Sequence, residues 1–374
     1  EYMETSAMPE QKMPEPILIT GYICGDYSYQ EDLEHFREQY PNPNFLPKNP
    51  KIYSDGKVPI LPGTAQNFLD FLGNGAGKFI NQNVVSGGGG ENSRKAFNRL
   101  NVPTQYTDTC ETPPFPLPEI DSDQAYFAGV CQPSISLVIP IANHGSGAGT
   151  FTIKSGRGDV KRYLEKEVRE KITGKLKTGI DILVNSISNE HLAETIAENK
   201  QGDIYTVVTT YLDRNGYALN KLLKKSRISF FSTKEFYWLL GKEDRSERFE
   251  GEVRRENFKN LREDMEGFAS KNKLEGALIV TLGQYGAVHY HRAEGKKGVW
   301  TCLKKGIRED IQEFISNQKK STNTMGDNFT AAATQASREG KSLKQAAREG
   351  CRFSIKQVLG YPEEINGDFN VEEI

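Results

Sequence analysis

Apolar residues follow two alternating patterns along the second half of the chain. Short, almost continuously apolar runs, such as 204–209 and 277–281, are typical of strands that are buried on both faces. Between them, apolar residues return every three or four positions, as they do on one face of a helix. Strands that alternate with helices favour a mostly parallel sheet covered by helices on both sides. The pattern therefore predicts a doubly wound α/β fold.

The same pattern gives approximate bounds for individual elements. A helix is expected after the glycine run at 87–90, because Ala96 and Phe97 fall on one face. Gly241 directly follows the helix expected at 233–240, which is the usual position of a glycine that ends a helix. The remaining elements are strands at 17–23, 180–184, 204–209, 227–231, 277–281 and 287–290, and helices at 190–198, 216–224, 252–271 and 326–359.

One domain is expected to occupy residues 17–360. Residues 1–16 are polar, contain prolines and lack an apolar secretory core, so we interpret them as a disordered tail or a vector-derived remnant. Residues 361–374 are expected to form a C-terminal tail. The ordered part of the chain is thus predicted to be a single unit with short extensions.

Two segments interrupt the α/β pattern, at about 27–77 and about 102–160. The first is rich in Pro, Asn, Tyr and Gly, and it is longer than an ordinary connection within a compact domain. The second contains strand-like runs at 134–141 and 150–153 and no convincing helix. We interpret the first segment as an elaboration or lid and the second as a small β element, and we expect the second, with part of the first, to form a small β lid.

Charge and cysteine content narrow the classes of partner. The 48 Lys and Arg residues are balanced by 50 Asp and Glu residues, so no basic excess is available for nucleic acid. The longest apolar runs are far shorter than the ~20 residues of a membrane helix, so no membrane partner is expected. The five cysteines are scattered without CxxC spacing, which indicates a reducing compartment and predicts a cytoplasmic protein.

A helix start at 324–327 is the first candidate for chemistry. The backbone amides of Thr324, Met325 and Gly326 begin this helix, and amides at such a position can cradle an anionic phosphate. Asp327 can accept a proton from a hydroxyl that attacks this phosphate. The alternative is that Asp327 is an ordinary first-turn carboxylate that stabilises the helix.

A glycine-rich segment and a strand-end carboxylate are the second candidates. Gly87 and Gly88 allow the backbone to approach a ligand closely, and Asn92 can both donate and accept hydrogen bonds. Asp26 follows the first predicted strand, where ligands often bind in α/β proteins. Hydroxyl groups need partners of this kind. The alternatives are a flexible linker for the glycines and a turn residue for Asp26.

These residues resemble the ribokinase-like, or PfkB-type, carbohydrate and nucleoside kinases, and they occur in the same order. Residues 21–26 resemble the first strand of that family with its substrate-binding Asp, and residues 87–100 (GGGGENSRKAFNRL) resemble its N-terminal signature. Glu235 falls where the NxxE motif places its Glu. The sequence TLGQYG at 281–286 resembles the nucleotide-side loop, and Gly326–Asp327 resemble the end of the C-terminal signature.

The resemblance implies a small-molecule kinase that transfers the terminal phosphate of a nucleotide, with ATP as the expected donor, to a sugar, polyol or nucleoside hydroxyl. Asp327 would be the general base, and the amides at 324–327 would hold the phosphate. Mg²⁺ would bridge the nucleotide phosphates beside Glu235. The acceptor would be bound by Asp26, Gly87, Gly88 and Asn92. The nucleotide would be bound by Ser232, Thr281, Gly283 and Gly286.

Departures from the family pattern leave alternatives open. Ser232 replaces the Asn of NxxE, and Thr324 and Met325 replace small Gly and Ala residues. Ser321 replaces an Asp, so a monovalent-cation site either is missing or is supplied by Asn323 with Thr324. A catalytically silent protein that binds a ligand or a protein, and an ADP-dependent sugar kinase, remain alternatives. In relatives within the ribokinase-like family the lid often also forms the dimer interface, so the resemblance also implies a possible homodimer through the lid.

Two other motifs are interpreted as unrelated to this chemistry. His289 and His291 alternate on a predicted strand, but no third metal ligand is evident, so we expect surface or edge histidines. No GxGxxG joins the first strand to a helix, which disfavours a dinucleotide-binding oxidoreductase.

Overall fold

The structure of the protein is a computed structural model. It describes residues 14–21, 24–28, 33–46, 57–59, 67–68, 70–72, 85–108, 125–127, 134–141, 149–154, 166–185, 190–209, 216–242, 254–292, 298–318, 324–362, 364–365 and 369–373. Ser321 and Asn323, for which the sequence suggested a cation site, lie outside these residues. Within this part of the chain, no helix is both long enough and apolar enough to cross a bilayer.

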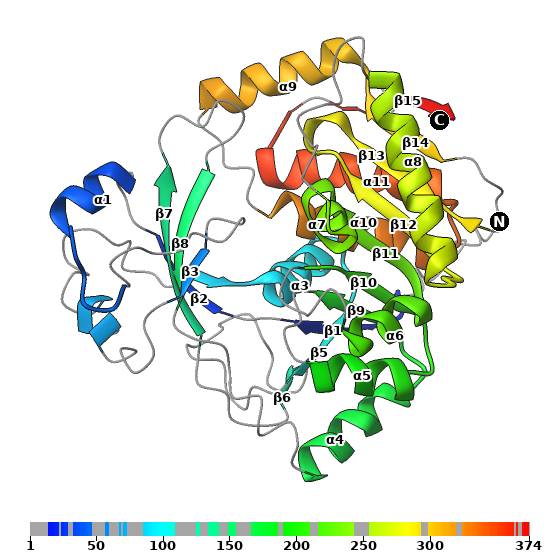
Figure 1. Cartoon of the computed structure of the whole chain (residues 1–374), viewed down its shortest axis with the longest axis horizontal. Helices are drawn as coiled ribbons and strands as arrows, with labels where there is room; N and C mark the ends of the chain where they lie inside the picture. Colours follow the sequence, from blue (N-terminus) through cyan, green and yellow to red (C-terminus); the bar gives the residue numbers. More distant parts are fainter. Residues whose placement is uncertain are drawn as a thin grey trace, which may run out of the picture.

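A ten-stranded sheet forms the centre of the molecule (Figure 1), in the order β15-β14-β13-β12-β11-β10-β9-β1-β5-β6. Pairing is parallel from β6 through β12 and antiparallel from β12 to β15. The mostly parallel sheet predicted from the sequence is therefore confirmed. Its strands are β1 (Ile17–Gly21), β5 (Thr104–Asp108), β6 (Ala125–Phe127), β9 (Ile182–Asn185), β10 (Ile204–Val207), β11 (Ser226–Ser232), β12 (Ala277–Thr281), β13 (Ala287–Tyr290), β14 (Val299–Leu303) and β15 (Phe369–Glu373).

Helices cover both faces of this sheet, as the alternating pattern predicted. One face carries α4 (Lys166–Leu176), α5 (Glu190–Asn199), α6 (Tyr217–Lys225), α7 (Thr233–Leu240) and α8 (Arg254–Lys271). The other face carries α3 (Gly89–Arg99), α10 (Met325–Arg338) and α11 (Leu343–Ser354), which continues as a π-helical turn at Ile355–Leu359. Helix α9 (Lys305–Gln318) connects β14 to the segment before α10.

The central strands are apolar on both faces because both faces are buried. In β9, Ile182 and Val184 join the core under α4 and α5, whereas Leu183 points into the core under α3 and α10. All three side chains are 0% exposed. A strand with two covered faces has no solvent side on which to place polar residues, which explains the short continuous apolar runs in the sequence.

A second, five-stranded sheet stands beside the first and is called the lid sheet below (Figure 1). Its order is β3-β8-β7-β2-β4, and its strands are β3 (Lys57–Pro59), β8 (Gly149–Lys154), β7 (Ser134–Ile141), β2 (Cys24–Ser28) and β4 (Val85–Gly87). Strand β2 follows β1 closely in sequence, and β4 leads directly into α3. The chain thus passes between the body and the lid sheet four times: from β1 to β2, from β4 to α3, from β6 to β7 and from β8 to α4.

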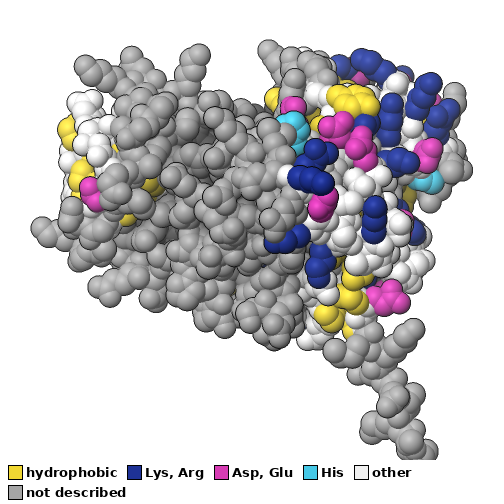
Figure 2. All heavy atoms as spheres, turned by 90° about the horizontal axis from the view of Figure 1, so that it is seen from below, with side chains coloured by type: hydrophobic (Ala, Val, Ile, Leu, Met, Phe, Trp, Pro, Cys, Tyr) yellow, Lys and Arg dark blue, Asp and Glu magenta, His cyan; other side chains and the backbone are white. Residues whose placement is uncertain are grey.

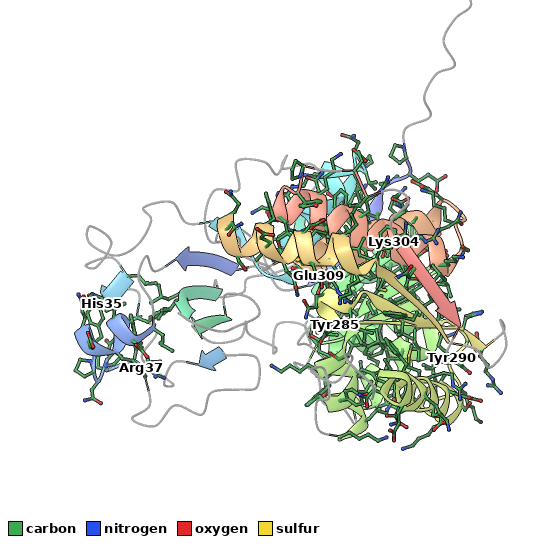
Figure 3. All side chains as sticks on the ribbon, turned by 90° about the horizontal axis from the view of Figure 1, so that it is seen from above. His35, Arg37, Tyr285, Tyr290, Lys304 and Glu309 are labelled. Carbon is green, nitrogen blue, oxygen red and sulfur yellow. The ribbon has the colours of Figure 1, made fainter. Side chains whose placement is uncertain are left out.

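One face of the lid sheet is covered by the chain itself. Helix α1 (Leu33–Gln39) packs on β7, and both Leu137 and Ile139 of β7 are fully buried there. Figures 1 and 3 both place α1, with the labelled His35 and Arg37, on the side of the lid sheet away from the body. The aromatic members of this cluster contact one another ring to ring: Phe36, Tyr40, Phe45, Phe68 and Phe71.

Charged side chains on the surface of the body are mixed. Figure 2 shows Lys and Arg side chains beside Asp and Glu side chains on the face seen from below. Lys221 of α6, for example, pairs with Glu194 and Glu198 of α5. These pairs link neighbouring helices at the surface, where water and salt screen the attraction between the charges.

Several expectations from the sequence differ from the structure. The run predicted as one strand at 17–23 ends at Gly21, and the chain then enters the lid sheet through β2. Residues 361–374, expected to be a tail, instead include edge strand β15, which pairs with β14. Tyr361 and Ile365 are buried beside α9. The end of the chain is therefore part of the packed body.

His289 was expected at the surface or at a sheet edge, and this expectation is wrong. It lies in β13, between β12 and β14, and only 3% of it is exposed. Burial, with a smaller contribution from the positive charge of Lys344, lowers the pKa of His289 to about 4. None of the described residues lies within hydrogen-bond distance of its Nε2. His289 is therefore a neutral core residue.

Protonation of His289 should make the fold sensitive to acid. An unfolded histidine has a pKa of about 6.5, so between pH 6.5 and 4 the unfolded chain binds a proton that the folded chain does not. Stability should therefore fall by about 2 to 3 kcal/mol between pH 7.5 and 4.5 through this group. Urea unfolding at both pH values measures the loss, and His289→Leu should remove that part of it. His191→Leu, which removes an exposed imidazole on α5, is the matched control; an unchanged acid slope in His289→Leu would contradict the assignment.

Candidate active site

Four elements converge at one edge of the large sheet. Strands β1 and β9 end there at Gly21 and Asn185, which are register partners, and helices α3 and α10 begin beside them. The ends of β1 and β9 can approach each other closely because Gly21 has no side chain. A Cβ at this position would lie 1.6 Å from the carbonyl oxygen of Asn185. The carboxyl ends of parallel strands are where α/β proteins usually bind ligands.

Asp327 lies in the first turn of α10 and receives hydrogen bonds from two asparagines. Asn92 of α3 donates from Nδ2 to Oδ2 at 2.9 Å, and Asn185 of β9 donates from Nδ2 to Oδ1 at 2.8 Å. Asp327 and Asn92, both expected in the site from the sequence, are thus brought within hydrogen-bond distance. Each carboxylate oxygen of Asp327 therefore accepts a hydrogen bond from a different element of the fold.

Asn185 was not predicted from the sequence. It is the last residue of β9, where the apolar run 182–184 changes to a polar side chain, and only 1% of it is exposed. A buried polar residue at the end of a central parallel strand is a signal of a binding site, and that signal was present. Its partner Asp327 is 142 residues away, so the contact itself could not be found from local sequence.

The glycine-rich segment forms the transition from the lid sheet to α3. Gly87 ends β4 and Gly88 has φ 90°, a conformation that glycine adopts without strain. Glu91 and Arg94 form a bidentate ion pair at 2.8 and 2.9 Å on the buried side of α3. Asp26 lies in β2, where it pairs with Val85 of β4 and Ser136 of β7 through the backbone. Residues 87–94 therefore form the connection from the lid sheet into α3, and Asp26 lies on the strand that pairs with the lid end of this connection.

The start of α10 is held from two neighbouring helices. Ser354 of α11 donates from Oγ to the carbonyl oxygen of Met325 at 3.0 Å. Asn328 donates from Nδ2 to the carbonyl of Thr324, and Arg99 of α3 donates to Asn328 Oδ1 at 3.3 Å. The amides of this first turn are therefore presented in a fixed direction.

Open space lies above this turn at Gly326. Apart from its two chain neighbours and the backbone of α10 itself, no described atom lies within 4 Å of the position that a Cβ at Gly326 would occupy. The first amides of an α-helix have no partner within the helix and carry partial positive charge. Amides of this kind are a common binding site for phosphate groups, and the glycine places no side chain beside them.

The backbone conformation at Thr324 shows why the family signature has a small residue at this position. Its φ is 69°, a left-handed conformation in which a β-branched residue is strained, and its side chain makes no capping bond to α10. Glycine is the residue that adopts this conformation at little cost, which gives a physical reason for the small residue in the signature.

Replacing Thr324 with glycine should stabilise the protein. Relief of the left-handed strain is worth about 1 to 2 kcal/mol, and the extra flexibility of glycine in the unfolded chain offsets part of this, leaving a gain of up to about 1 kcal/mol. Chemical unfolding of Thr324→Gly measures the gain. Thr324→Ala keeps a Cβ and is the matched control, which should show no gain; equal effects of both variants would contradict the strain argument.

The residues expected to bind the nucleotide lie two and three strands away from Asn185. Ser232 ends β11 and Thr281 ends β12, and the two are register partners. Strand spacing places these ends roughly 10 to 14 Å along the edge from Asn185. Gly283, in the 3-10 turn Gly283–Tyr285 after β12, has φ 59° and open space at its Cβ position. Figure 3 shows Tyr285 of this turn within the body.

Gly286 has a structural role that does not depend on a ligand. Its φ is 86°, and a Cβ at this position would lie 2.0 Å from the carbonyl oxygen of Thr301. The glycine therefore permits the tight turn from β12 into β13 against β14. Its assignment to the nucleotide site stays a prediction.

Ser232 and Glu235 form a capping box at the start of α7. Ser232 donates from its backbone N and its Oγ to Glu235 Oε2 at 2.8 and 2.7 Å, and Glu235 N donates back to Ser232 Oγ at 3.3 Å. Ser and Asn are comparable N-caps, so the serine preserves the cap that an Asn would make in the NxxE motif. The box fixes the carboxylate of Glu235 at the same edge of the sheet.

Magnesium is the metal that the family implies. Among the described residues, no three His, Cys, Asp or Glu side chains gather in a way that could hold a metal ion. Mg²⁺ beside a nucleotide usually takes one or two carboxylates, with phosphates and water as its remaining ligands. The single fixed carboxylate of Glu235 fits that mode of binding.

Solved structures with the same architecture are kinases of small hydroxyl compounds. Ribokinase from Arabidopsis thaliana, complexed with ribose and ATP, superposes with a TM-score of 0.57 at 15% identity, covering 95% of this chain and 96% of that chain. Adenosine kinase from Sinorhizobium meliloti gives 0.59 at 14% identity, covering 92% and 94%. Phosphofructokinase-2 from Escherichia coli with fructose-6-phosphate gives 0.54 at 14% identity, covering 93% and 95%. These similarities show the ribokinase-like fold.

The fold is thus that of the ribokinase-like kinases. A family profile described as pfkB family carbohydrate kinase matches residues 158–360, which is more than half of the chain. The chain belongs to the pfkB family of carbohydrate kinases, and it is a phosphotransferase with an alcohol group as acceptor. A search among curated proteins found no match.

Proposed function

We propose that this protein transfers the terminal phosphate of ATP to a hydroxyl group of a sugar, polyol or nucleoside. The observation that carries the proposal is Asp327, held by Asn92 and Asn185 in the first turn of α10, next to Gly326, whose Cβ position is open. A base and an anion site within one helical turn are what in-line phosphoryl transfer requires.

The acceptor binds on the lid side of Asp327. Asn92 is partly exposed beside the carboxylate, and an amide can donate to one acceptor hydroxyl while accepting from another. Gly87 and Gly88 supply backbone at close range, and Asp26 lies in the adjacent lid strand β2. Asp26, Gly87, Gly88 and Asn92 remain the proposed acceptor-binding residues.

The chemical step moves one proton and one phosphoryl group. The acceptor oxygen forms a bond to the terminal phosphorus as the bond from that phosphorus to the bridging oxygen breaks, and the electron pair leaves with the nucleoside diphosphate. The hydroxyl proton passes to Asp327. The amides of Thr324, Met325 and Gly326, with that of Asp327, stabilise the charge on the transferring group.

The nucleotide lies along the strand ends from α10 towards β12. Ser232, Thr281, Gly283 and Gly286 are the proposed contacts, supported by their positions at the ends of β11 and β12. Glu235 would hold Mg²⁺, which supplies positive charge that neutralises the phosphates when it is bound.

The lid sheet is proposed to close over the acceptor and exclude water, which limits hydrolysis of the nucleotide. Because α1 and its aromatic cluster cover one face of this sheet, a homodimer through the lid would have to use the other face or the edge strands β3 and β4.

Asp327→Asn should abolish turnover. The amide cannot accept the hydroxyl proton at neutral pH, so kcat should fall by about 10²-fold to 10⁴-fold or more. The affinity for the nucleotide should change little. A coupled assay with ATP or ADP, Mg²⁺ and a panel of sugars, polyols and nucleosides measures turnover, and calorimetry measures nucleotide binding. ADP-dependent turnover would reveal the sugar-kinase alternative. Silence of the unaltered protein with every donor and acceptor would favour the non-catalytic alternative, and full activity of Asp327→Asn would overturn the role of the base.

Glu235→Gln should separate the metal role of this residue from its capping role. Glutamine fills the same position in the capping box of α11, where Ser342 pairs with Gln345, so the helix cap should survive. Loss of the charge should raise the Mg²⁺ concentration for half-maximal activity at least about tenfold. Ser232→Ala, which breaks the box but keeps the carboxylate, is the matched control for stability. An unchanged Mg²⁺ requirement in Glu235→Gln would remove Glu235 from the metal site.

A further inference from the structure

Asn185 connects three parts of the site through one amide group. Its Nδ2 lies 2.8 Å from Asp327 Oδ1, 2.8 Å from Ser93 Oγ and 3.0 Å from the carbonyl oxygen of Gly89. An amide has two N–H donors, so one of them is shared between two of these acceptors. The side chain is therefore held in a single orientation by α10 and by the first turn of α3.

The two asparagines that contact Asp327 differ in their surroundings. Asn185 is 1% exposed and ends a strand whose other side chains are 0% exposed. Asn92 is partly exposed on α3, directly after the glycine-rich segment. A group that a ligand can reach exchanges partners more readily than one locked between a strand and two helices. Asn185 is the fixed donor of the pair, and Asn92 is the donor that an acceptor can reach.

We propose that Asn185 is a positioning residue for the reaction, which holds Oδ1 of Asp327 so that Oδ2 takes the proton from the acceptor. This inference rests on the proposed function of Asp327 as the base. The N–H bond to Oδ1 fixes the plane of the carboxylate and favours its ionised form. Oδ2, which faces the exchangeable Asn92, then presents a lone pair to the acceptor hydroxyl.

The same side chain ties the base to the lid connection. Gly89 and Ser93 lie in the first turns of α3, which follows β4 of the lid sheet. Because Asn185 holds both this turn and Asp327, the base and the acceptor-binding segment keep one relative position. Removal of the amide should therefore disturb the protonation of Asp327 more than the binding of the nucleotide.

The pH dependence of kcat/KM distinguishes this role from a merely structural one. In Asn185→Ala and Asn185→Ser, loss of the donor should move the acid limb of the profile to higher pH by about one unit. We expect kcat to fall about 10-fold to 100-fold, and KM for the nucleotide to change less than about threefold. Asn199→Ala, which removes an asparagine on α5 bonded to Thr195, is the matched control and should leave the profile unchanged.

Two results of this experiment would overturn the inference. A loss of kcat with an unmoved acid limb would assign Asn185 a structural role only. A large rise in KM for the nucleotide with an unmoved acid limb would assign it to nucleotide binding.

A measurement on the unaltered protein covers the case in which the Asn185 variants do not fold. The side-chain amide ¹⁵N signal of Asn185 should shift as Asp327 titrates, and this shift should be absent in Asp327→Asn. A signal that does not respond to pH in the unaltered protein would overturn the inference without any activity assay. Absence of turnover in a protein that shows the coupled titration would instead overturn the proposed kinase function, so the two failures are distinguishable.

Discussion

The carboxylate of Asp327, bonded to Asn92 and Asn185, is the interaction on which the geometry of the site depends. It joins the start of α10, the start of α3 and the end of β9 at one point. A half-buried carboxylate without donors would cost about 1 to 3 kcal/mol or more, so these three elements are favoured in this arrangement. The same bonds that hold the elements together also orient the group proposed to accept the proton.

The architecture of the body was largely predictable because it follows from local patterns. The helix at 233–240 and the strand at 277–281 have the predicted bounds, since a glycine ends the first and both faces of the second are buried. The candidate pair Asn92 and Asp327 was also found, because each lies at a helix start with recognisable residues around it. Features encoded within one or two turns of chain can be read in this way.

Other features could not be predicted because they depend on distant partners. Asn185 acquires its place in the site only when β9 lies beside β1 and α10 packs over them. Burial of His289 depends on coverage of β13 by α11, and β15 is a strand only because β14 offers an edge. Helix α9 is different, because its apolar residues recur at helical spacing. This helix could have been predicted from the sequence, and it was not.

The aromatic cluster beneath α1 gives the lid sheet a hydrophobic core separate from the two cores of the body. Burial of each large aromatic side chain is worth about 1.5 to 3 kcal/mol, and these contacts lie entirely within the lid. The lid therefore has its own internal cohesion, and its distance from the body can change without loss of these contacts. In mechanical terms it is a plate that the chain joins to the body at four points, of which one passes through Gly88 into the helix that carries Asn92.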